Sequence, residues 1–309
     1  MARQSFVFAC HERPDGDCLG AALAMARAFR GLGKDVTVLS RDPVPEHYRF
    51  LPESETVLST TPRRDFDVGV LVDSDMPKRV GDAAEAVTGA RMLACVDHHL
   101  SSEEFGEVRI VDRAVSSTCE LVVDLFDAND VPIDRETATM LLAGIIFDTG
   151  GFRYSNASAR TFEIVSRLAG LGASPSAIAR EVFESRPLRS VKLLGRALSS
   201  MQASDDGRIV WAQITCADYR ELDADDADTE GIVNSVAAVK GPQVAILFRE
   251  TEPGTVRVSL RSREGFDVNQ VARVFDGGGH AAAAGCTLEG ALEEAKSRVI
   301  EEVRRWMGS

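Results

Sequence analysis

The sequence from residue 5 to residue 29 reads SFVFACHERPDGDCLGAALAMARAF: an apolar run, a turn with two Asp residues and a second apolar run. Residues 6–10 are typical of a buried strand, whereas residues 18–29 carry apolar side chains at helical spacing. The glycine between Asp15 and Asp17 permits a tight turn, so both carboxylates can face one cavity. This order predicts the first strand, turn and helix of an α/β sheet.

The same alternation of strand and helix patterns continues beyond this stretch. Further strands are expected at residues 36–39, 68–72, 92–96 and 108–111, and helices at residues 117–127 and 135–147. Residues 158–201 have a helical pattern, and strands return after a polar break at residues 204–207. We therefore predict an α/β protein with a mainly parallel N-terminal sheet flanked by helices (residues 1–185), a helical connector (186–204) and a smaller α/β domain (205–309).

Composition restricts the class of protein and of substrate. The chain has 309 residues, a length that suggests two domains. Its net charge of −13 argues against binding of long duplex nucleic acid, which requires many cationic contacts to phosphates, and favours short substrates. No apolar stretch approaches the roughly 18 residues of a membrane span, and the first residues lack the features of a signal peptide. We expect a cytoplasmic protein without a membrane partner, whose six Cys residues are buried and reduced.

Four short clusters of Asp and His each follow an apolar run. They contain His11 with Asp15 and Asp17, then Asp73, then Asp97 with His98 and His99, and finally Asp148. Any one of these residues could be a helix cap or an exposed strand end, but the carboxyl ends of strands in open α/β sheets converge on one crevice. Mixed imidazole and carboxylate ligands suit Mn²⁺, Fe²⁺, Co²⁺ or Zn²⁺. Because two cations about 3.5–4 Å apart can clamp the oxygens of a phosphoryl displacement, we expect a two-metal hydrolase acting on phosphorus.

The motifs themselves resemble those of a known family. His-x-x-Pro-Asp-Gly-Asp at residues 11–17, Val-Asp-Ser at 72–74, Asp-His-His at 97–99 and Phe-Asp-Thr-Gly at 147–150 resemble the DHH phosphoesterase superfamily. VSLRSR at residues 258–263, Asn269 and GGGHAAAAG at 277–285 resemble the DHH-associated substrate-binding domain. The two-domain length is similar to that of the nanoRNase/pAp phosphatase (NrnA-type) branch. It leaves no room for the additional nucleic-acid-binding domain of RecJ-type exonucleases, and the basic C-terminal motif of family II pyrophosphatases is absent from the sequence.

The resemblance implies two bound Mn²⁺ ions, with Co²⁺ or Mg²⁺ as substitutes. His11, Asp15 and Asp73 would hold the first ion, and Asp17, Asp73, His98 and Asp148 would hold the second, so that Asp73 bridges the two. The nucleophile would be a water or hydroxide between the ions. His99 would contact the scissile phosphate or the leaving oxygen, and Asp97 would orient an imidazole. Asp75 stands where the family has a small polar residue, and we interpret it as a residue that is not a ligand.

Substrate contacts are expected mainly in the last third of the chain. Arg261 and Arg263 share one face of a strand by the period of two. The run with Gly278, Gly279 and His280 can bring backbone N–H groups and an imidazole to a phosphate, although a flexible turn is the alternative interpretation. Asn269 is expected to be an N-cap with a secondary binding role. In the first domain, Ser117 and its neighbours Ser116 and Thr118 stand at a helix start that could bind a phosphate oxygen.

The activity implied by the resemblance is Mn²⁺-dependent hydrolysis of short oligoribonucleotides (nanoRNA), linear dinucleotides included, to nucleoside 5′-monophosphates. The active site would lie in the cleft between the two domains. Conversion of 3′-phosphoadenosine 5′-phosphate (pAp) to AMP is a second expected reaction. An exopolyphosphatase or pyrophosphatase and a cyclic-dinucleotide phosphodiesterase stay open as alternatives. A non-catalytic nucleotide sensor is less favoured, because every expected ligand position is filled. The many apolar helix faces favour a homodimer.

Overall fold

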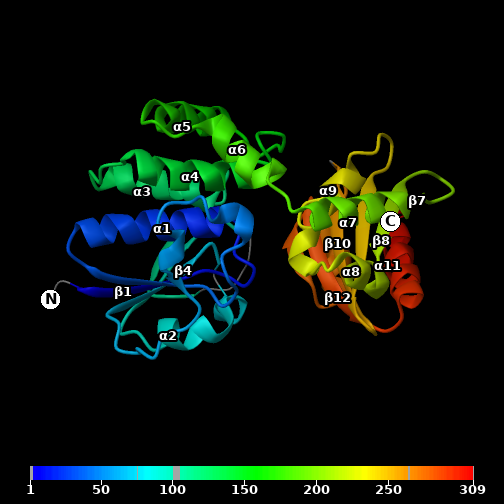
Figure 1. Cartoon of the computed structure of the whole chain (residues 1–309), viewed down its shortest axis with the longest axis horizontal. Helices are drawn as coiled ribbons and strands as arrows, with labels where there is room; N and C mark the ends of the chain where they lie inside the picture. Colours follow the sequence, from blue (N-terminus) through cyan, green and yellow to red (C-terminus); the bar gives the residue numbers. More distant parts are fainter. Residues whose placement is uncertain (1–2, 75, 100–104, 264, 309) are drawn as a thin grey trace. The chain divides into compact units, whose positions relative to one another are not determined.

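The computed structural model describes residues 3–74, 76–99, 105–263 and 265–308, and its contacts divide the chain into two compact units, Met1–Ser185 and Arg186–Ser309. Each unit contains its own six-stranded sheet with helices packed on it (Figure 1). The prediction of an α/β protein with a mainly parallel first sheet and a second, smaller α/β unit is confirmed. Asp75 lies outside the described residues.

The first sheet is entirely parallel in the order β3-β2-β1-β4-β5-β6. Its strands are β1 (Ser5–Ala9), β2 (Asp35–Leu39), β3 (Val57–Leu58), β4 (Val68–Val72), β5 (Leu93–Asp97) and β6 (Val108–Val111). The direction of strand progression reverses between β1 and β4, and ligands of open α/β sheets bind beyond the carboxyl ends of the strands at such a point. The loops after β1 and β4 carry two of the four Asp and His clusters.

Helices cover both faces of this sheet in layers (Figure 1). They are α1 (Gly16–Gly31), α2 (Ala84–Thr88), α3 (Thr118–Ala128), α4 (Arg135–Asp148), α5 (Ala159–Gly170) and α6 (Pro175–Glu184), with short 3₁₀ turns η1 (Glu46–Tyr48), η2 (Ser54–Thr56) and η3 (Pro77–Ala83). Helix α2 packs on one face through a small core that includes Val87 and Leu71. Helix α1 packs on the other face, with α3 and α4 against α1 and with α5 and α6 outermost. This stacking buries residues 16–26 of α1 and most of α4 from Thr137 to Ile146.

Two glycines allow α1 and α4 to approach closely. A Cβ atom added to Gly20 would collide with the carbonyl oxygen of Met140, and a Cβ added to Gly144 would lie 2.7 Å from Oδ1 of Asp17 and nearer still to Sγ of Cys119. The missing side chain at Gly144 therefore leaves the space in which the Asp17 carboxylate lies.

Replacing Gly144 by Ala is expected to lower the free energy of unfolding by about 1–3 kcal/mol, because the added methyl group overpacks the contact between α1 and α4. Urea unfolding followed by circular dichroism measures this change. Gly170→Ala is the matched control, since Gly170 ends α5 and a Cβ there meets no atom within 4 Å. Equal unfolding midpoints for the two variants would contradict the prediction.

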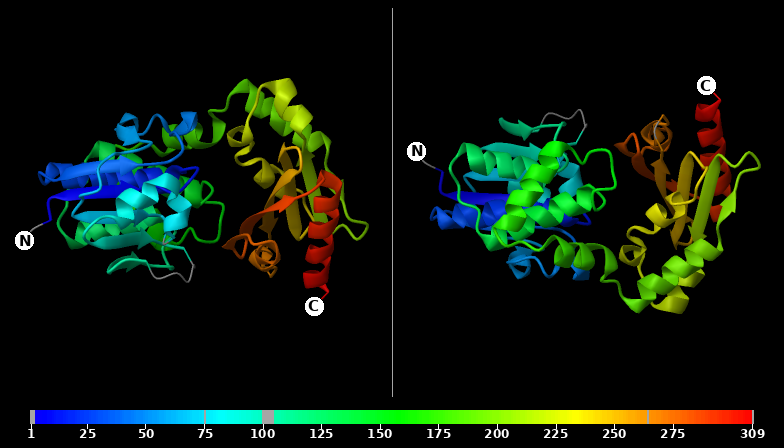
Figure 2. Two further views of the ribbon diagram at one scale, coloured as in Figure 1. Left: turned by 90° about the horizontal axis from the view of Figure 1, so that it is seen from below. Right: turned by 90° about the horizontal axis from the view of Figure 1, so that it is seen from above.

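The second sheet is mixed, with the order β11-β12-β10-β9-β8-β7. Its strands are β7 (Gln202–Ala203), β8 (Ile209–Ile214), β9 (Val244–Glu252), β10 (Thr255–Ser262), β11 (Gly278–His280) and β12 (Ala283–Glu289). Its helices are α7 (Leu188–Ser199), α8 (Cys216–Leu222), α9 (Ile232–Ala237), α10 (Val268–Val274) and α11 (Leu292–Met307), and the unit also contains the 3₁₀ turn η4 (Asp226–Thr229). Helices α10 and α11 bury one face of the sheet, while α7, α8 and α9 bury the other. Figure 2 shows α11, in red, lying along the strands.

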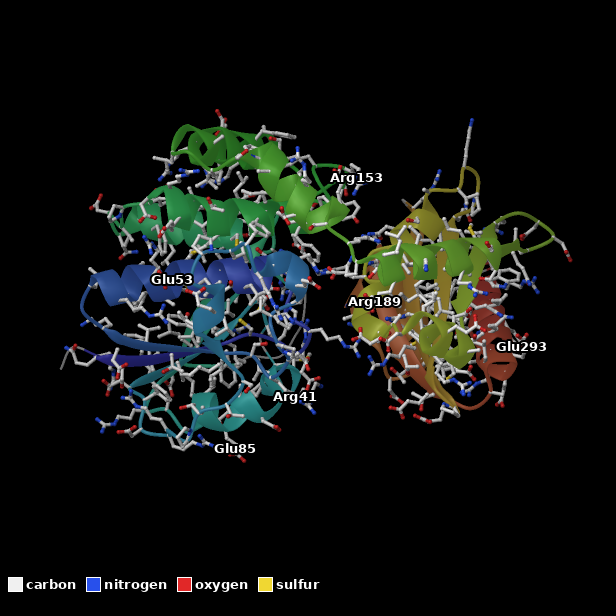
Figure 3. The ribbon with its side chains drawn as sticks, in the orientation of Figure 1. Arg41, Glu53, Glu85, Arg153, Arg189 and Glu293 are labelled. Carbon is white, nitrogen blue, oxygen red and sulfur yellow. The ribbon has the colours of Figure 1, made fainter. Side chains whose placement is uncertain are left out.

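The segment expected as a connector, residues 186–204, forms α7 and β7 and belongs to the second unit. Leu193 and Ala197 of α7 are completely buried in its core, and Arg189, labelled in Figure 3, forms an ion pair with Asp228. Among the described residues, no helix is long and apolar enough to cross a membrane.

Candidate functional site

The loop after β1 presents an imidazole and two carboxylates. Asp15 caps α1, because its Oδ1 accepts hydrogen bonds of 3.0 Å from the backbone N–H groups of Asp17 and Cys18. His11 is buried, and its Nδ1 lies 2.8 Å from the carbonyl oxygen of Glu12. Since a carbonyl only accepts, Nδ1 carries the proton in the neutral ring and Nε2 keeps its lone pair. A metal-binding imidazole requires this protonation pattern. The Nε2 atom of His11 lies 3.6 Å from Oδ2 of Asp15.

Asp73 lies at the centre of the site. It follows β4, is 2% exposed and has a backbone φ of 57°, a left-handed conformation that Asp adopts more readily than most residues. Its Oδ2 lies 3.4 Å from Nε2 of His11, and its Oδ1 lies 3.7 Å from Nε2 of His98. The two oxygens of one carboxylate thus face imidazoles that come from two different strands.

Asp97 at the end of β5 organises the two imidazoles that follow it. Its Oδ1 accepts the backbone N–H of His98 at 2.9 Å and the ring Nδ1–H of His99 at 2.8 Å. This contact fixes the ring of His99 and its protonation pattern. The other oxygen, Oδ2, is buried and has no hydrogen-bond partner among the described residues.

Two helices complete the ring of carboxylates around His98. Asp148 is the last residue of α4, and its Oδ2 lies 3.1 Å from Nε2 of His98. Asp17 lies in the first turn of α1, is completely buried, and has its Oδ2 3.8 Å from the same nitrogen. The structure therefore brings together the motif residues that the sequence separates by up to 137 positions.

The electrostatic environment is that of a cation site. Burial lowers the pKa of His98, but the carboxylates of Asp148 and its neighbours outweigh this effect and raise the pKa to about 10. Burial, together with the nearby charges of Asp73 and Asp148, raises the pKa of Asp17 well above its usual range. For Asp73, burial acts upward, but the imidazoles of His99, His11 and His98 hold its pKa below the usual range. So many buried carboxylates are stable only beside positive charge, which divalent cations supply.

The donor atoms fall into groups of the size that a metal ion requires. Three sets of ligand atoms lie within 4.8 Å of one another: His11, Cys18 and Asp73; Asp73, His98 and His99; and Asp17, His98 and Asp148. Asp73 belongs both to the set with His11 and to the set with His98 and His99, an arrangement in which one carboxylate can serve two neighbouring cations. The imidazole and carboxylate donors fit Mn²⁺ or a similar divalent ion. Cys18 instead donates its S–H to the Val72 carbonyl at 3.4 Å, and burial raises the pKa of its thiol, so it packs as an uncharged side chain.

Two contacts outside this ring connect the loop after β1 to neighbouring segments. Arg41, labelled in Figure 3, forms an ion pair with Glu12 in the loop after β1. The same loop is tied to η3 through the backbone N–H of Glu12, which donates to the carbonyl oxygen of Arg79 at 2.6 Å. Neither contact was expected from the sequence.

Ser117 serves helix α3. It is completely buried, so its side chain is not exposed to the phosphate suggested from the sequence, and its hydroxyl oxygen accepts the backbone N–H of Glu120 at 3.0 Å as the N-cap. The Glu120 carboxylate accepts the backbone N–H of Ser116 at 3.3 Å. The next two amides of the helix, those of Thr118 and Cys119, donate to Asp17.

Apart from Ser117, the residues predicted to bind substrate lie in the second unit, and two details differ from expectation. Arg263 directly follows β10, and its backbone N–H donates to the Gln243 carbonyl at 3.0 Å, which continues the pairing of β10 with β9. Its side chain donates to the Val239 carbonyl at 2.8 Å. Gly278, Gly279 and His280 form the edge strand β11 instead of a loop, since they pair with the small residues of β12 from Ala283 to Gly285. Asp267, not Asn269, caps α10, and Oδ1 of Asn269 is buried without a partner among the described residues. Arg261 donates from Nε to Oδ1 of Asn234 at 3.0 Å.

Comparison with known proteins identifies both units. Residues 5–145 match the N-terminal domain of the DHH family, and residues 206–309 match the DHHA1 domain. A bifunctional oligoribonuclease and PAP phosphatase NrnA of Thermus thermophilus is 35% identical over 96% of this chain and 88% of its own length. A probable protein of the same name from Streptococcus mutans is 27% identical over 89% of this chain and 86% of its own length. The crystal structure of an exopolyphosphatase-related protein from Bacteroides fragilis superimposes with a TM-score of 0.90 and 27% identity, covering 98% of this chain and 93% of that one.

Proposed function

Since the chain belongs to the DHH family and is, like its relatives, a phosphoesterase, we propose that it hydrolyses short oligoribonucleotides to nucleoside 5′-monophosphates with the help of two Mn²⁺ ions. Hydrolysis of pAp to AMP is the second reaction that we propose for the same site. Both activities are named for the Thermus thermophilus relative, which is similar over 96% of this chain. The six Cys residues are all free, and five are buried as expected, whereas Cys216 is partly exposed. Free thiols accord with action in the reducing cytoplasm.

The observation that carries this proposal is the position of Asp73 between two sets of donors. Its Oδ2 faces His11 at 3.4 Å, and its Oδ1 faces His98 at 3.7 Å. A single buried carboxylate between two imidazole-containing groups is the ligand arrangement of a bimetal centre. Bimetal centres suit in-line displacement at phosphorus, because both the attacking and the leaving oxygen need stabilisation.

Each side chain of the site then has a defined task. His11, Asp15 and Asp73 would hold one cation, and Asp17, Asp73, His98 and Asp148 would hold the other. When bound, the cations lower the pKa of water and stabilise negative charge on the phosphate. Asp97 holds His99 through Nδ1, and His99 would donate to the scissile phosphate or the leaving oxygen. Burial of His11, Asp17 and Asp73 strengthens the charge interactions among them, whereas Asp15 and Asp148 stay partly exposed.

The second unit would bind the remainder of the substrate. Arg261, Arg263, Gly278, Gly279, His280 and Asn269 are the residues that we propose for this task. Small side chains along β11 and β12 let a phosphate approach backbone N–H groups, and Arg261 and His280 add donors that strengthen when the acceptor is charged. Asn269, a partly exposed residue of α10, would contact a sugar hydroxyl or a base amino group.

Removing the metal ions with EDTA is expected to abolish hydrolysis, and adding Mn²⁺ to restore it, because no other group in the site can stabilise the transferred phosphate to the same extent. The assay measures mononucleotide release from RNAs of two to five residues and AMP release from pAp. Cyclic di-AMP, pyrophosphate and polyphosphate are assayed in parallel. Robust hydrolysis of pyrophosphate or polyphosphate without release of mononucleotides would overturn the proposed substrate class.

A further inference from the structure

Thr118 contacts two carboxylates of the metal site at once. Its hydroxyl donates to Oδ1 of Asp73 at 2.7 Å, and its backbone N–H donates to Oδ2 of Asp17 at 2.7 Å. The next amide, that of Cys119, donates to Oδ1 of Asp17 at 2.8 Å. Thr118 is completely buried, so its hydroxyl is not available to a substrate phosphate.

The start of α3 creates these contacts. The first amides of a helix have no acceptor within the helix. Ser117 caps the helix by bonding the Glu120 amide, and the amides of Thr118 and Cys119 remain directed at Asp17 of α1. Both oxygens of Asp17 are therefore held by backbone groups of another helix, and the positive end of the α3 dipole lies beside a negative charge.

The hydrogen bond from the Thr118 hydroxyl restricts rotation of the Asp73 carboxylate about its terminal torsion. The backbone conformation does not restrict this rotation. The terminal torsion of an Asp side chain is broad, so Asp73 could turn its two oxygens out of line with His11 and His98. A carboxylate oxygen has about two lone-pair sites. The Thr118 hydroxyl occupies one site on Oδ1 and leaves the other free, while Oδ2 faces His11. The bond thus fixes the carboxylate plane and leaves at least one lone pair on each oxygen for a cation.

We propose that Thr118 is a positioning residue, which holds Asp73 through its hydroxyl and Asp17 through its amide in the orientation that two divalent cations require. This inference rests on the proposed function, because it concerns the same pair of cations. It assigns no contact between Thr118 and substrate. The hydroxyl contact is specific to the side chain, whereas the amide contact survives substitution, so the two can be separated by experiment.

Thr118→Val removes the hydroxyl and keeps the shape and the amide. We expect the dissociation constant for Mn²⁺, measured by calorimetric titration of the metal-free protein, to rise about 10- to 100-fold, the range seen when a group that orients a metal ligand is lost. At saturating Mn²⁺, kcat should fall while KM for a dinucleotide stays unchanged. Thr118→Ser keeps the hydroxyl, and we expect it to bind Mn²⁺ within about threefold of the original protein.

Thr161→Val is the matched control. Thr161 is also completely buried, and its hydroxyl donates to Oε2 of Glu120 at 2.9 Å in the same unit. This variant loses the same type of bond, so we expect a comparable loss of thermal stability with Mn²⁺ affinity unchanged. Thr118→Ala provides a second variant without the hydroxyl if Thr118→Val does not fold, and the same loss of Mn²⁺ affinity is expected.

Three results would overturn the inference: Mn²⁺ affinity in Thr118→Val or Thr118→Ala equal to that of the original protein, failure of Thr118→Ser to restore it, or an equal loss of affinity in Thr161→Val. Failure of the proposed function would give a result that differs from these three. In that case the unaltered protein itself would bind no Mn²⁺ or release no mononucleotides.

Discussion

Asp73→Asn is expected to raise the dissociation constant for Mn²⁺ more than about 100-fold, beyond the range for losing a group that only orients a ligand, and to abolish turnover. The physical reason is the position of Asp73 between His11 and His98, at 3.4 and 3.7 Å. An amide in place of the carboxylate removes the negative charge that both proposed cations share. Each cation would then keep only the ligands on its own side.

Asn is the informative replacement because of the backbone at this position. Asp73 has a φ of 57°, which Asn tolerates and which Ala would strain. The amide oxygen of Asn can still accept the Thr118 hydroxyl, so the variant should fold. Asp130→Asn is the matched control, since Asp130 also has a positive φ of 53° but lies exposed after α3. Metal content and turnover near those of the original protein in Asp73→Asn would show that Asp73 does not bridge two cations.

The sequence predicted the parts of the site that come from local patterns. An apolar run followed by Asp and His predicts a strand end and a candidate metal ligand, and the strands β1, β4 and β5 end where these runs predicted. Helices α1, α3 and α4 were predicted from their apolar spacing, and all are present. The short elements β3, β7, α8 and η4 were missed, because two to seven residues carry too little periodicity to be recognised.

Contacts between distant segments could not be predicted in the same way. Thr118 reaches Asp17 across 101 positions and Asp73 across 45, and nothing in the local sequence distinguishes this threonine from an ordinary helix start. The strand β11 shows a second reason. Gly278, Gly279 and His280 carry no strand pattern of their own, and they form a strand only because β12 lies beside them.

His280→Ala is expected to leave Mn²⁺ binding unchanged and to lower kcat/KM for a dinucleotide about 10- to 150-fold. His280 lies at the end of β11 in the second unit, whereas the groups that bind cations in our proposal all lie in the first. A hydrogen bond to a charged phosphate contributes about 1.5–3 kcal/mol, and each 1.4 kcal/mol corresponds to tenfold in kcat/KM.

The two variants test opposite halves of the mechanism when they are measured side by side. His280→Ala should affect only the binding of substrate and transition state, so its Mn²⁺ titration should coincide with that of the original protein. Asp73→Asn should lose the cations whether or not substrate is present. If His280→Ala lost Mn²⁺ while Asp73→Asn retained both ions, the assignment of cations to the first unit and substrate to the second would be wrong. If both variants lost Mn²⁺ binding and substrate binding together, this assignment would be contradicted as well. The two units would then have no separate roles.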